Sequence, residues 1–399
     1  MNGIILGCKR LDMIEPYLNK NQIKYTCIEL NEEHSVASSL NNKIKYLKEN
    51  DYINEVINIL QKRSIDFILS NASTDYQAIL NSQIGTEAHN LYNVLFLGHS
   101  VETTLLFSNK YETKLLLEKN NILTPKYTYC SSKKQLLREC EEIGFPLIVK
   151  SLYGCAGKDQ CIARNNIELE NFVNTCKESD YIIEKFLDGL EVSIEVFKSK
   201  SSFLYLPPIY KSYTSLNGLH SLEKVRIFPY SFDHNLLEKA KMISEKIATL
   251  IPINGWLDID AILVGEKLYV IEVNPRFSGV SRLIGMAMNV NPYEIMLQTY
   301  LENAMNFNDN LSGVSIEVPI SNDFPSDNAN NIYCSIRPHA KNSKGFITVS
   351  SKNFELLREK LIQIGQQNIN LSRDIKYGLN IIDRLNNVGS YELNEKYEC

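Results

Sequence analysis

The sequence predicts a multidomain chain in which an α/β segment is followed by α+β segments. The first hundred residues alternate short β-rich apolar runs with helical stretches, which is the pattern of parallel βαβ units. Between about residues 150 and 275 most strand candidates are joined by loops, which favours antiparallel pairing. With 399 residues the chain is too long for one core, because single cores usually stop growing beyond about 250 residues.

Composition excludes several classes of function. Hydrophobic residues make up 44% and charged residues 22% of the chain, as in an ordinary globular protein. The net charge of −5 gives no electrostatic reason to expect nucleic acid or an anionic membrane as the main partner. No apolar run approaches the roughly 18 to 20 residues that span a bilayer, and the start lacks the basic region of a signal peptide. We therefore expect a cytoplasmic protein with no nucleic-acid or membrane partner.

The nine cysteines predict neither a disulfide framework nor a zinc site. They are odd in number, and no Cys-x-x-Cys pair or His/Cys cluster has the spacing of metal ligands. Most of them are expected to be reduced thiols in the core.

Residues 1–107 are expected to form a Rossmann-like domain. The first strand runs into Gly7 without a G-x-G-x-x-G motif, so a dinucleotide site is only weakly supported. Glu29 at the end of the second strand is accordingly interpreted as a solvated carboxylate rather than a ribose ligand. The strand candidates are Gly3–Leu6, Tyr25–Leu30, Asp66–Ser70 and Asn93–Gly98, and the clearest helix is Tyr52–Lys62.

A second domain is expected over residues 108–310, with a flap subdomain at about 127–190. Ser108 is a candidate N-cap for a helix that contains Leu115–Leu117 and ends before Pro125. The further elements expected in this domain are a strand at Lys126–Cys130, a helix at Lys133–Ile143, strands at 145–150 and Gln160–Arg164, and helices at Asn235–Leu250 and from Pro292 to about Met305.

The last part of the chain, residues 311–399, is expected to form a small α+β closing domain. It contains an Asn/Asp/Ser-rich stretch near Ser321–Asn331 that is typical of a linker or exposed loop, and the segment from Asn331 to about Asn386 mixes short strands with a helix. A helix is predicted at Asn353–Ile364.

The first segment that suggests chemistry is a strand ending at Lys150, followed by a loop of small residues. Gly154, Ala156 and Gly157 let backbone N–H groups come close to an anion, and Lys150 supplies positive charge. The loop is not a Walker loop, because Lys158 is followed by an aspartate and then by a strand. It is interpreted as a phosphate flap, with an ordinary glycine hairpin as the alternative.

A second segment joins two strands through a turn. The first strand ends in the run Glu184, Lys185, Phe186 and Leu187, and Glu191 opens the next strand. Such a hinge offers backbone groups and Glu184 to an adenine edge, while Glu191 accepts hydrogen bonds from ribose hydroxyls. The alternative is two charged residues that flank a turn.

The third segment is a predicted hairpin with two pairs of oxygen-bearing side chains. Residues two apart in a strand share a face, so Asp258 goes with Asp260 and Glu272 with Asn274. A three-residue turn, Gly265–Lys267, places Asp260 opposite Glu272 and Asp258 opposite Asn274.

All four side chains then share one face, and Leu268 and Val270 are expected on it as well. Clustered acids repel one another unless a cation neutralises them, and oxygen ligands suit Mg²⁺. Asp260, Glu272 and Asn274 are therefore candidate metal ligands, and the alternative is the solvated face of an amphipathic hairpin.

Together the three segments resemble the ATP-grasp superfamily of carboxylate–amine ligases. The run from Glu184 to Glu191 is similar to the adenine–ribose hinge of D-alanine–D-alanine ligases. Asp260…Glu272-x-Asn274-x-Arg276 is similar to the metal-binding hairpin of biotin carboxylase and carbamoyl phosphate synthetase. Lys150 matches the strand-end lysine that contacts the α-phosphate.

A stretch upstream extends the resemblance. Asn109-Lys110 and the run Asn121–Pro125 resemble the family's D-K…G-I-x-x-P stretch, which makes Lys110 its first nucleotide lysine. Asn109 stands where aspartate is common, so this match departs from the family pattern. The likeness covers about residues 1–310.

The resemblance implies a fold, cofactors and a reaction. Residues 1–107 become the preATP-grasp domain, and residues 108–310 an ATP-grasp fold of two α+β subdomains. ATP and one or two Mg²⁺ ions are implied, with Mn²⁺ able to substitute. ATP would phosphorylate a substrate carboxylate, and an amine would then attack the acyl phosphate, with release of ADP and phosphate.

Basic residues complete the implied site. Arg276 would hold the carboxylate and then the tetrahedral oxyanion in a bidentate fork, with an exposed surface ion pair as the alternative. Lys211, Lys224 and Arg226 are all candidates to reach the γ-phosphate, and the sequence does not choose among them.

The resemblance implies amino acids as substrates, joined as amides or dipeptides. Homodimers are common among such enzymes, and no segment of the sequence identifies an interface. The alternatives are a purine-biosynthetic or carboxylase-type ATP-grasp enzyme and a catalytically inactive nucleotide-binding regulator.

Overall fold

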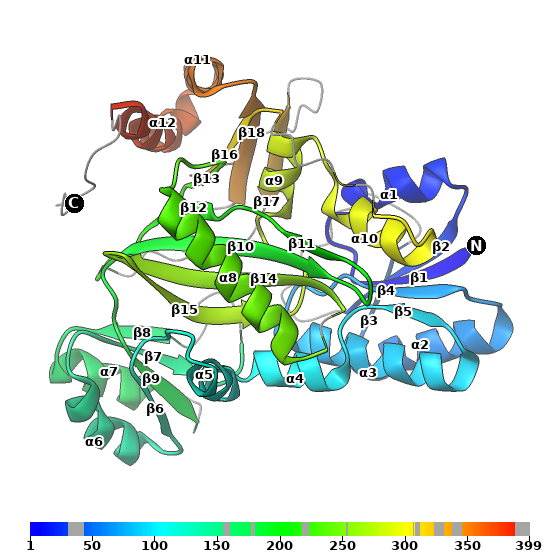
Figure 1. Cartoon of the computed structure of the whole chain (residues 1–399), viewed down its shortest axis with the longest axis horizontal. Coiled ribbons are helices and arrows are strands. Elements are labelled where there is room, and N and C mark those ends of the chain that lie inside the picture. The colour runs from blue at the N-terminus through cyan, green and yellow to red at the C-terminus, as the bar shows by residue number, and fades with distance from the viewer. Residues whose placement is uncertain are drawn as a thin grey trace.

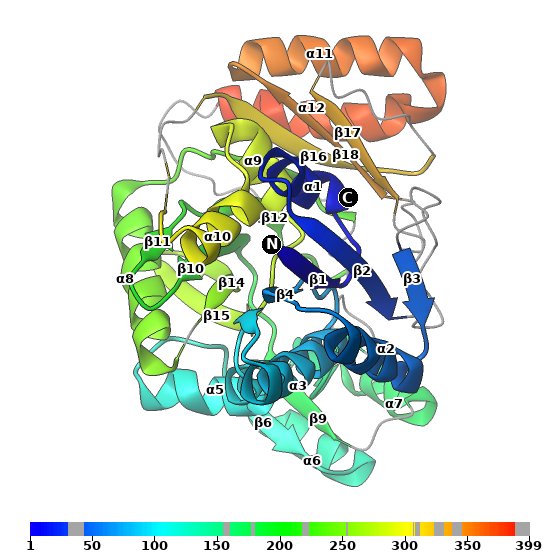
Figure 2. The same ribbon diagram turned by 90° about the vertical axis from the view of Figure 1, so that its right-hand side faces the viewer.

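The computed structural model describes residues 1–30, 44–154, 160–176, 180–217, 223–252, 254–305, 307, 312–322, 331–336 and 345–387. Within them the chain folds around three β-sheets (Figures 1 and 2). Two residues of the predicted flap, Ala156 and Gly157, lie outside the described residues, as does most of the predicted loop at 321–331. No helix of the described residues combines the length and the apolar character that a membrane crossing requires.

The N-terminal region is a parallel sheet with helices on both faces, as the sequence predicts. The strand order is β3-β2-β1-β4-β5. Alternate residues point to opposite faces, so Ile5 packs towards α1 while Ile4 packs towards α2 and α3. The elements are β1 Asn2–Leu6, α1 Leu11–Lys20, β2 Lys24–Leu30, β3 Ile44–Leu47, α2 Glu49–Lys62, β4 Phe67–Ser70, α3 Asp75–Tyr92, β5 Leu95–Leu97 and α4 Val101–Ser108.

Glu29 is buried, so its interpretation as a solvated carboxylate is wrong. The β1–α1 loop and α3 close over the end of β2, where Cys8 N and Gln77 Nε2 donate hydrogen bonds of 2.6 and 2.7 Å to the carboxylate. Burial raises the pKa of Glu29. The carboxylate therefore holds the β1–α1 loop in place.

Two cysteines, one just after β1 and one within β2, differ from the expectation of reduced thiols. Cys8 and Cys27 form a disulfide, with their Cα atoms 6.2 Å apart. The parallel pairing of β1 with β2 brings them together, and their separation of 19 residues gave no sign of it. Cys130, Cys140, Cys161, Cys176 and Cys334 are free thiols, in agreement with the expectation.

A small antiparallel sheet carries the predicted flap strands. Its order is β6-β9-β7-β8, and α6 and α7 pack against it. The elements are α5 Lys110–Lys119, β6 Tyr127–Cys130, α6 Lys133–Ile143, β7 Leu147–Ser151, β8 Gln160–Ala163, α7 Asn166–Thr175 and β9 Tyr181–Lys185. Helix α7, between β8 and β9, is not among the helices expected from the sequence.

The N-cap of α5 is Asn109, so the assignment of that role to Ser108 is wrong. Asn109 Oδ1 accepts hydrogen bonds from Tyr111 N and Glu112 N at 3.0 and 3.1 Å. Ser108 instead ends α4 and is buried. Serine and asparagine both cap helices well, so residue type alone does not distinguish them. Asn109 is the N-cap because it directly precedes the first residue of α5.

The large sheet is antiparallel, and its order is β15-β14-β10-β12-β13-β16-β18-β17, with β11 paired to β10. Apolar side chains on one face pack against α8, α11 and α12, and the opposite face carries most of the charged side chains described below. The elements are β10 Leu190–Lys198, β11 Phe203–Tyr205, β12 Ile209–Tyr213, β13 Arg226–Phe228, α8 His234–Leu250, β14 Gly255–Val264, β15 Lys267–Asn274, α9 Ser281–Met288, α10 Pro292–Leu301, β16 Val314–Ile320, β17 Ile332–Ile336, β18 Gly345–Ser351, α11 Phe354–Gln367, a 3₁₀ turn Ile369–Leu371 and α12 Ser372–Asn387.

The C-terminal strands continue this sheet. Strand β16 pairs with β13 through Ile316 opposite Ile227, and β18 and β17 follow, so the sheet runs on across the predicted boundary at residue 310. Helices α11 and α12 lie side by side over these strands (Figure 2). The predicted domain boundaries stay predictions.

The β14–β15 hairpin has the predicted pairing of its acids but a different turn. Asp260 lies opposite Glu272 and Asp258 opposite Asn274. The turn itself holds only the two residues between Val264 and Lys267, so the predicted three-residue turn is wrong. A register shift next to Asp260 restores the pairing of the acids.

This bulge also changes which side chains share a face. Leu268 and Val270 are buried in the core, whereas Ile271 lines the cleft with Glu272 and Asn274. The expectation that Leu268 and Val270 share the face of the acids is therefore wrong. One extra residue in β15 inverts the alternation, which lets the same strand anchor in the core and present ligands to the cleft.

Gly189, in the turn before β10, predicts a stability effect. A Cβ atom at this position would lie 2.3 Å from the Leu263 carbonyl oxygen. We expect Gly189→Ala to lower the free energy of unfolding by about 1–3 kcal/mol, because backbone must move to admit the methyl group. Urea unfolding of the variant and of wild type measures this difference in free energy. A free energy of unfolding equal to that of wild type in Gly189→Ala would contradict the steric explanation.

Candidate functional site

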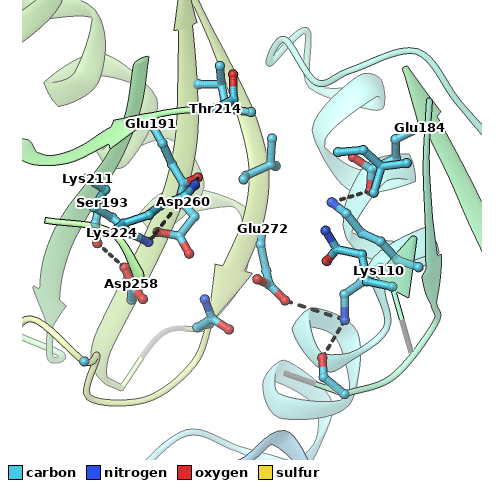
Figure 3. Close-up of a pocket in the computed structure, with 18 of the residues that line it drawn as sticks. Lys110, Glu184, Glu191, Ser193, Lys211, Thr214, Lys224, Asp258, Asp260 and Glu272 are labelled. Carbon is cyan, nitrogen blue, oxygen red and sulfur yellow. Dashed lines mark hydrogen bonds and ion pairs between the residues drawn. The ribbon is translucent and has the colours of Figure 1, made fainter. Parts of the chain in front are cut away.

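A cleft of about 780 Å³ lies between the three sheets, within the volume range of small-molecule sites. Every predicted site residue that the structure describes lines it. Figure 3 shows Glu191, Lys211 and Asp260 on the large-sheet side, and Lys110 and Glu184 across the cleft. The predicted site residues that line the cleft are Lys110, Lys150, Gly154, Glu184, Lys185, Phe186, Leu187, Glu191, Lys211, Lys224, Arg226, Asp260, Glu272, Asn274 and Arg276.

Strand register produces the acidic side of the cleft. Ser193 on β10, Asp260 on β14 and Glu272 on β15 are opposite one another, and the next row contains Glu195, Asp258 and Asn274. Side chains two residues apart in a strand share a face, so the two rows lie together.

A second bulge directs Lys211 into this acidic side. The register between β10 and β12 shifts between Leu190 and Val192, and Ser212 has a φ of +65°, which is rare for a residue other than glycine. Lys211 Nζ lies 2.6 Å from Asp260 Oδ1 and 3.3 Å from Glu191 Oε1. The lysine therefore bridges the two predicted ligand positions.

Glu191 pairs with two lysines, of which Lys224 is the second. Burial opposes its ionisation, but the Lys224 and Lys211 ammonium groups lower the pKa of Glu191 to about 2. The carboxylate is thus charged at neutral pH, and both of its oxygens accept hydrogen bonds.

Asp260 experiences the opposite effect. Burial and the neighbouring Asp258 carboxylate raise the pKa of Asp260 to about 7, against the effect of Lys211. Glu272 is charged, with Lys110 Nζ 3.6 Å from its Oε1, and Lys110 lowers the pKa of Glu272 although burial opposes this. A divalent cation between these carboxylates would relieve the repulsion.

The donor set fits Mg²⁺ in combination with phosphate oxygens. Asp260, Glu272 and Asn274 supply two carboxylates and one amide from neighbouring strands, and Mg²⁺ is commonly bound by one or two carboxylates plus substrate phosphates. Among the described residues no group of three or more His, Cys, Asp or Glu side chains is arranged to hold a metal ion by itself. An ion here therefore requires oxygens from a ligand.

Glu184 is fully buried between two lysines on the other side of the cleft. Its carboxylate lies 3.1 Å from Lys114 Nζ and 3.0 Å from Lys150 Nζ. Burial raises the pKa of Glu184, but Lys114 and Lys150 lower it further, so the group is charged. Two lysines and one carboxylate leave an excess positive charge at this end.

Lys114 was missed at the sequence level. It lies one helical turn after Lys110 on α5, a spacing that places both on one face and could have identified it. Its Nζ also donates to Thr124 Oγ1 at 2.8 Å, and burial lowers the pKa of Lys114 to about 8.

The hinge residues act through different groups. Lys185 Nζ donates to the carbonyls of Gly144 and Phe145 at 3.1 and 2.8 Å, so its side chain fixes the turn before β7. Phe186 is buried, and the Leu187 carbonyl accepts a hydrogen bond from Thr214 Oγ1 at 2.9 Å. Apolar side chains at this end of the cleft suit a flat aromatic base.

Lys110 and Arg276 connect the cleft walls. Lys110 Nζ donates to the Gly154 carbonyl at 2.6 Å, at the start of the predicted flap. Arg276 forms an ion pair with Asp75 at the beginning of α3. Both partners are largely buried, so the alternative of an exposed surface ion pair is wrong for Arg276. Asn71 and Ser73, in the segment that follows β4, also line the cleft.

Lys114→Met tests the nucleotide end of the cleft. We expect the KM for ATP to rise about tenfold, because Glu184 loses one of its two cations and no longer holds Lys150 in one position; hydrogen bonds to charged groups of this kind contribute about 1.5–3 kcal/mol. Steady-state ATP titration measures it. The control is Lys119→Met at the exposed end of the same helix, and an ATP titration unchanged from wild type in both variants would contradict the role of Lys114.

One part of the chain matches a known protein family, and longer stretches of it are similar to known proteins. Residues 107–280 match the family described as "ATP-grasp domain". The chain is 26% identical over 297 residues to the carbamoyl-phosphate synthase of Methanobrevibacter smithii, which covers 73% of the chain and 78% of that protein. Large chains of carbamoyl phosphate synthase from Clostridium species match over only 25–32% of their length, so the chain spans a quarter to a third of those relatives.

Solved structures share the fold of nearly the whole chain. The biotin carboxylase domain of Hydrogenobacter thermophilus 2-oxoglutarate carboxylase, in a complex with MgADP and bicarbonate, has a TM-score of 0.70 at 15% identity and covers 90% of this chain and 88% of that one. L-amino acid ligase from Bacillus licheniformis has a TM-score of 0.70 at 18% identity and covers 92% of this chain and 97% of that one. At identities of 15% and 18%, the similarity shows a shared fold.

Proposed function

The chain contains an ATP-grasp domain, and from this premise we propose that it is an ADP-forming ligase that activates a carboxylate with ATP and joins it to an amine. One observation carries the proposal. Asp260, Glu272 and Asn274 lie on neighbouring strands and face Lys110 and Lys150 across a single cleft. This arrangement supplies oxygen ligands and phosphate cations together, which phosphoryl transfer requires.

The nucleotide would lie with its base at the hinge and its phosphates between the lysines. Phe186 and Leu187 contribute the apolar surface for adenine, and Glu191 accepts hydrogen bonds from the ribose. Lys110, Lys150 and the backbone near Gly154 contact the phosphates.

Lys211 is the best candidate for the γ-phosphate among the three basic residues. Its ammonium group lies 2.6 Å from Asp260, whereas Lys224 pairs with Glu191 and Arg226 pairs with Glu317 at 3.0 Å. Lys211 thus occupies the position next to the proposed metal ligands. When bound, Mg²⁺ supplies neutralisation of the charge on the β- and γ-phosphates.

The chain's own groups then position the carboxylate. Arg276 holds it in a bidentate fork, and the Asp75 carboxylate orients the guanidinium. A carboxylate oxygen attacks the γ-phosphorus, the bond to the β,γ-bridging oxygen breaks and ADP leaves. The amine nitrogen attacks the carbonyl carbon of the acyl phosphate, the C–O bond to phosphate breaks, and the amine gives up its proton to solvent.

The proposed carboxylate and amine are amino acids. L-amino acid ligase from Bacillus licheniformis shares the fold over most of both chains, which supports this choice without deciding it. A second candidate is bicarbonate as the carboxylate, because the relatives matched by sequence are carbamoyl-phosphate synthases. The predicted homodimer also belongs to this proposal, and light scattering on the purified chain tests it.

Formation of ADP tests the proposal. The full chain is incubated with ATP and Mg²⁺ and either pooled L-amino acids, bicarbonate with ammonia, or neither, and products are identified by mass spectrometry. We expect amino acids to stimulate ADP release and to give a product that has lost one water. Stimulation only by bicarbonate with ammonia would select the second candidate, and no stimulation by any mixture would contradict ligase function.

A further inference from the structure

The disulfide between Cys8 and Cys27 lies directly beside the cleft. Cys8 is in the loop between β1 and α1, and the two residues that follow it, Lys9 and Arg10, line the cleft. The proposed phosphoryl transfer does not use the disulfide. Its position next to two basic residues of the cleft wall therefore calls for another explanation.

Cys27 is the fixed half of the disulfide. It is fully buried in β2, where it lies opposite Ile5 of β1 on one side and Ile44 of β3 on the other. Its side chain packs in the same apolar core as residues of α1. A buried residue between two strands cannot shift without disturbing both strand pairings.

Cys8 is the half that can be displaced. It is partly exposed and follows the end of β1, and Gly7 before it has a φ of +103°, which glycine adopts without strain. The Cys8 N–H donates to Glu29 Oε2 at 2.6 Å, and the Lys9 carbonyl accepts from Asn71 Nδ2 at 2.5 Å. These hydrogen bonds and the disulfide together fix the loop.

Reduction of the disulfide requires the two sulfur atoms to separate. Bonded sulfur atoms are about 2.0 Å apart, whereas non-bonded heavy atoms need about 3.5–4 Å. Because Cys27 is fixed in β2, most of the added separation falls on Cys8 and on the residues that follow it. The loop that lines the cleft therefore has different positions in the two redox forms.

Arg10 transmits this displacement to the cleft wall. Its Nη1 donates to the hydroxyl of Tyr293 at 3.3 Å, and Tyr293 belongs to α10, which lies beside α1 (Figure 1). The hydroxyl donates to Asn71 Oδ1 at 2.9 Å, and the Tyr293 ring stacks on Phe277 with ring centroids 3.8 Å apart. Asn71 and Phe277 line the cleft, and Phe277 is next to Arg276, the proposed carboxylate ligand. A shift of Arg10 thus disturbs the wall that would face the carboxylate.

We propose that the Cys8–Cys27 pair is a redox switch that sets the position of Arg10 and thereby the affinity of the cleft for the substrate other than ATP. This inference rests on the proposed function and adds a form of regulation to the same cleft. The disulfide form holds Arg10 on Tyr293 and binds that substrate, whereas the dithiol form releases Arg10 and binds it more weakly.

The chemistry of the switch needs only a dithiol reductant. A thiolate of the reductant attacks Cys8 Sγ, because Cys8 is partly exposed and Cys27 is buried; the S–S bond breaks, and Cys27 Sγ leaves as a thiolate that takes up a proton. The second thiolate of the reductant attacks the mixed disulfide, and Cys8 Sγ leaves in the same way. The protein gains two electrons and two protons, and the reductant becomes a cyclic disulfide.

Hydrogen exchange tests the displacement of the loop without any substrate. The full chain is equilibrated with oxidised or reduced dithiothreitol, and mass spectrometry after alkylation identifies the form present. We expect the amides of residues 8–13 to exchange about tenfold faster in the reduced form, while peptides from β7 and β9 stay unchanged. Equal exchange of residues 8–13 in both forms, or an oxidised chain without the Cys8–Cys27 disulfide, would show that the proposal is wrong.

Steady-state kinetics tests the effect on the cleft. ADP release is measured in both redox forms with whichever mixture stimulates it, pooled L-amino acids or bicarbonate with ammonia. We expect reduction to raise the apparent KM for that mixture about tenfold, as for the loss of a hydrogen bond from a charged group. The KM for ATP is expected to change less than about twofold, because Lys150 and Glu184 belong to the small sheet. Equal changes in both KM values would indicate a general loss of structure and overturn the proposal.

Variants assign the effect to the pair and to Arg10. Cys8→Ser lacks the bond under both conditions and is expected to give the same KM values with and without reductant. Arg10→Met is expected to respond less than about twofold, because it lacks the guanidinium that carries the effect. Cys176→Ser removes a partly exposed free thiol far from the loop in sequence, and as the matched control it should keep the full response. A full response in Cys8→Ser or Arg10→Met, or a lost response in Cys176→Ser, would overturn the proposal.

The two measurements separate failure of the switch from failure of the ligase function. Faster exchange of residues 8–13 on reduction, with no ADP formed from any mixture, would contradict the ligase function and still support the redox-dependent loop. ADP formation with the same KM values and the same hydrogen exchange in both redox forms would overturn the switch and leave the ligase function standing.

Discussion

Glu272→Gln is expected to lower ATP-dependent turnover by about a thousandfold or more. The change removes a charged oxygen that the proposed Mg²⁺ site shares with Asp260 and Asn274, and metal charge neutralisation contributes several kcal/mol to phosphoryl transfer. The side chain lies at the cleft surface of β15 and is isosteric with glutamine, so the fold is expected to remain. ADP release at saturating ATP measures the effect.

The control for this variant lies in the same hairpin. Glu266→Gln removes an exposed carboxylate from the turn between β14 and β15, and we expect turnover equal to wild type. Turnover of Glu272→Gln within tenfold of wild type would contradict the metal assignment. Equal losses in both variants would attribute the effect to the hairpin rather than to the ligand.

Arg276→Lys is expected to lower kcat about a hundredfold with little change in the KM for ATP. Lysine keeps the positive charge that pairs with Asp75. It cannot present two parallel N–H groups to a carboxylate or an oxyanion. Loss of one preorganised donor to a developing oxyanion typically costs about 10²–10³ in kcat. Steady-state kinetics with ATP and the carboxylate varied in turn separates the two effects.

Arg282→Lys is the matched control, because Arg282 pairs with Asp12 at 2.6 Å on α1 and does not line the cleft. It should leave both constants close to wild type. A rise in the KM for ATP with an unchanged kcat in Arg276→Lys would instead assign Arg276 to the nucleotide phosphates.

The predicted fold class is confirmed, and residues 107–280 match the ATP-grasp domain family that the sequence motifs resemble; the reason lies in local patterns. The βαβ units of the first hundred residues and the β14–β15 hairpin follow from periodicity within single segments, and the acids pair as predicted. ATP and Mg²⁺ are the ligands that ATP-grasp enzymes use, as the sequence implied. The role of each site residue remains a prediction.

The features that the sequence missed depend on packing between distant segments. The bulge in β15 arises where Val270 must face the core while Glu272 faces the cleft, and no local pattern encodes a one-residue shift. The ion pair between Arg276 and Asp75 joins residues 201 positions apart. The Cys8–Cys27 disulfide likewise depends on which strands become neighbours.

Anomalous diffraction from Mn²⁺ bound with a non-hydrolysable ATP analogue tests the central claim most directly, because it places the metal and the phosphates in one experiment. We predict a manganese peak in contact with oxygens of Asp260, Glu272 and Asn274 and with the β- and γ-phosphates, while Lys211 turns from Asp260 towards the γ-phosphate. A nucleotide bound in the cleft with the manganese elsewhere, or a nucleotide bound outside the cleft, would contradict the account.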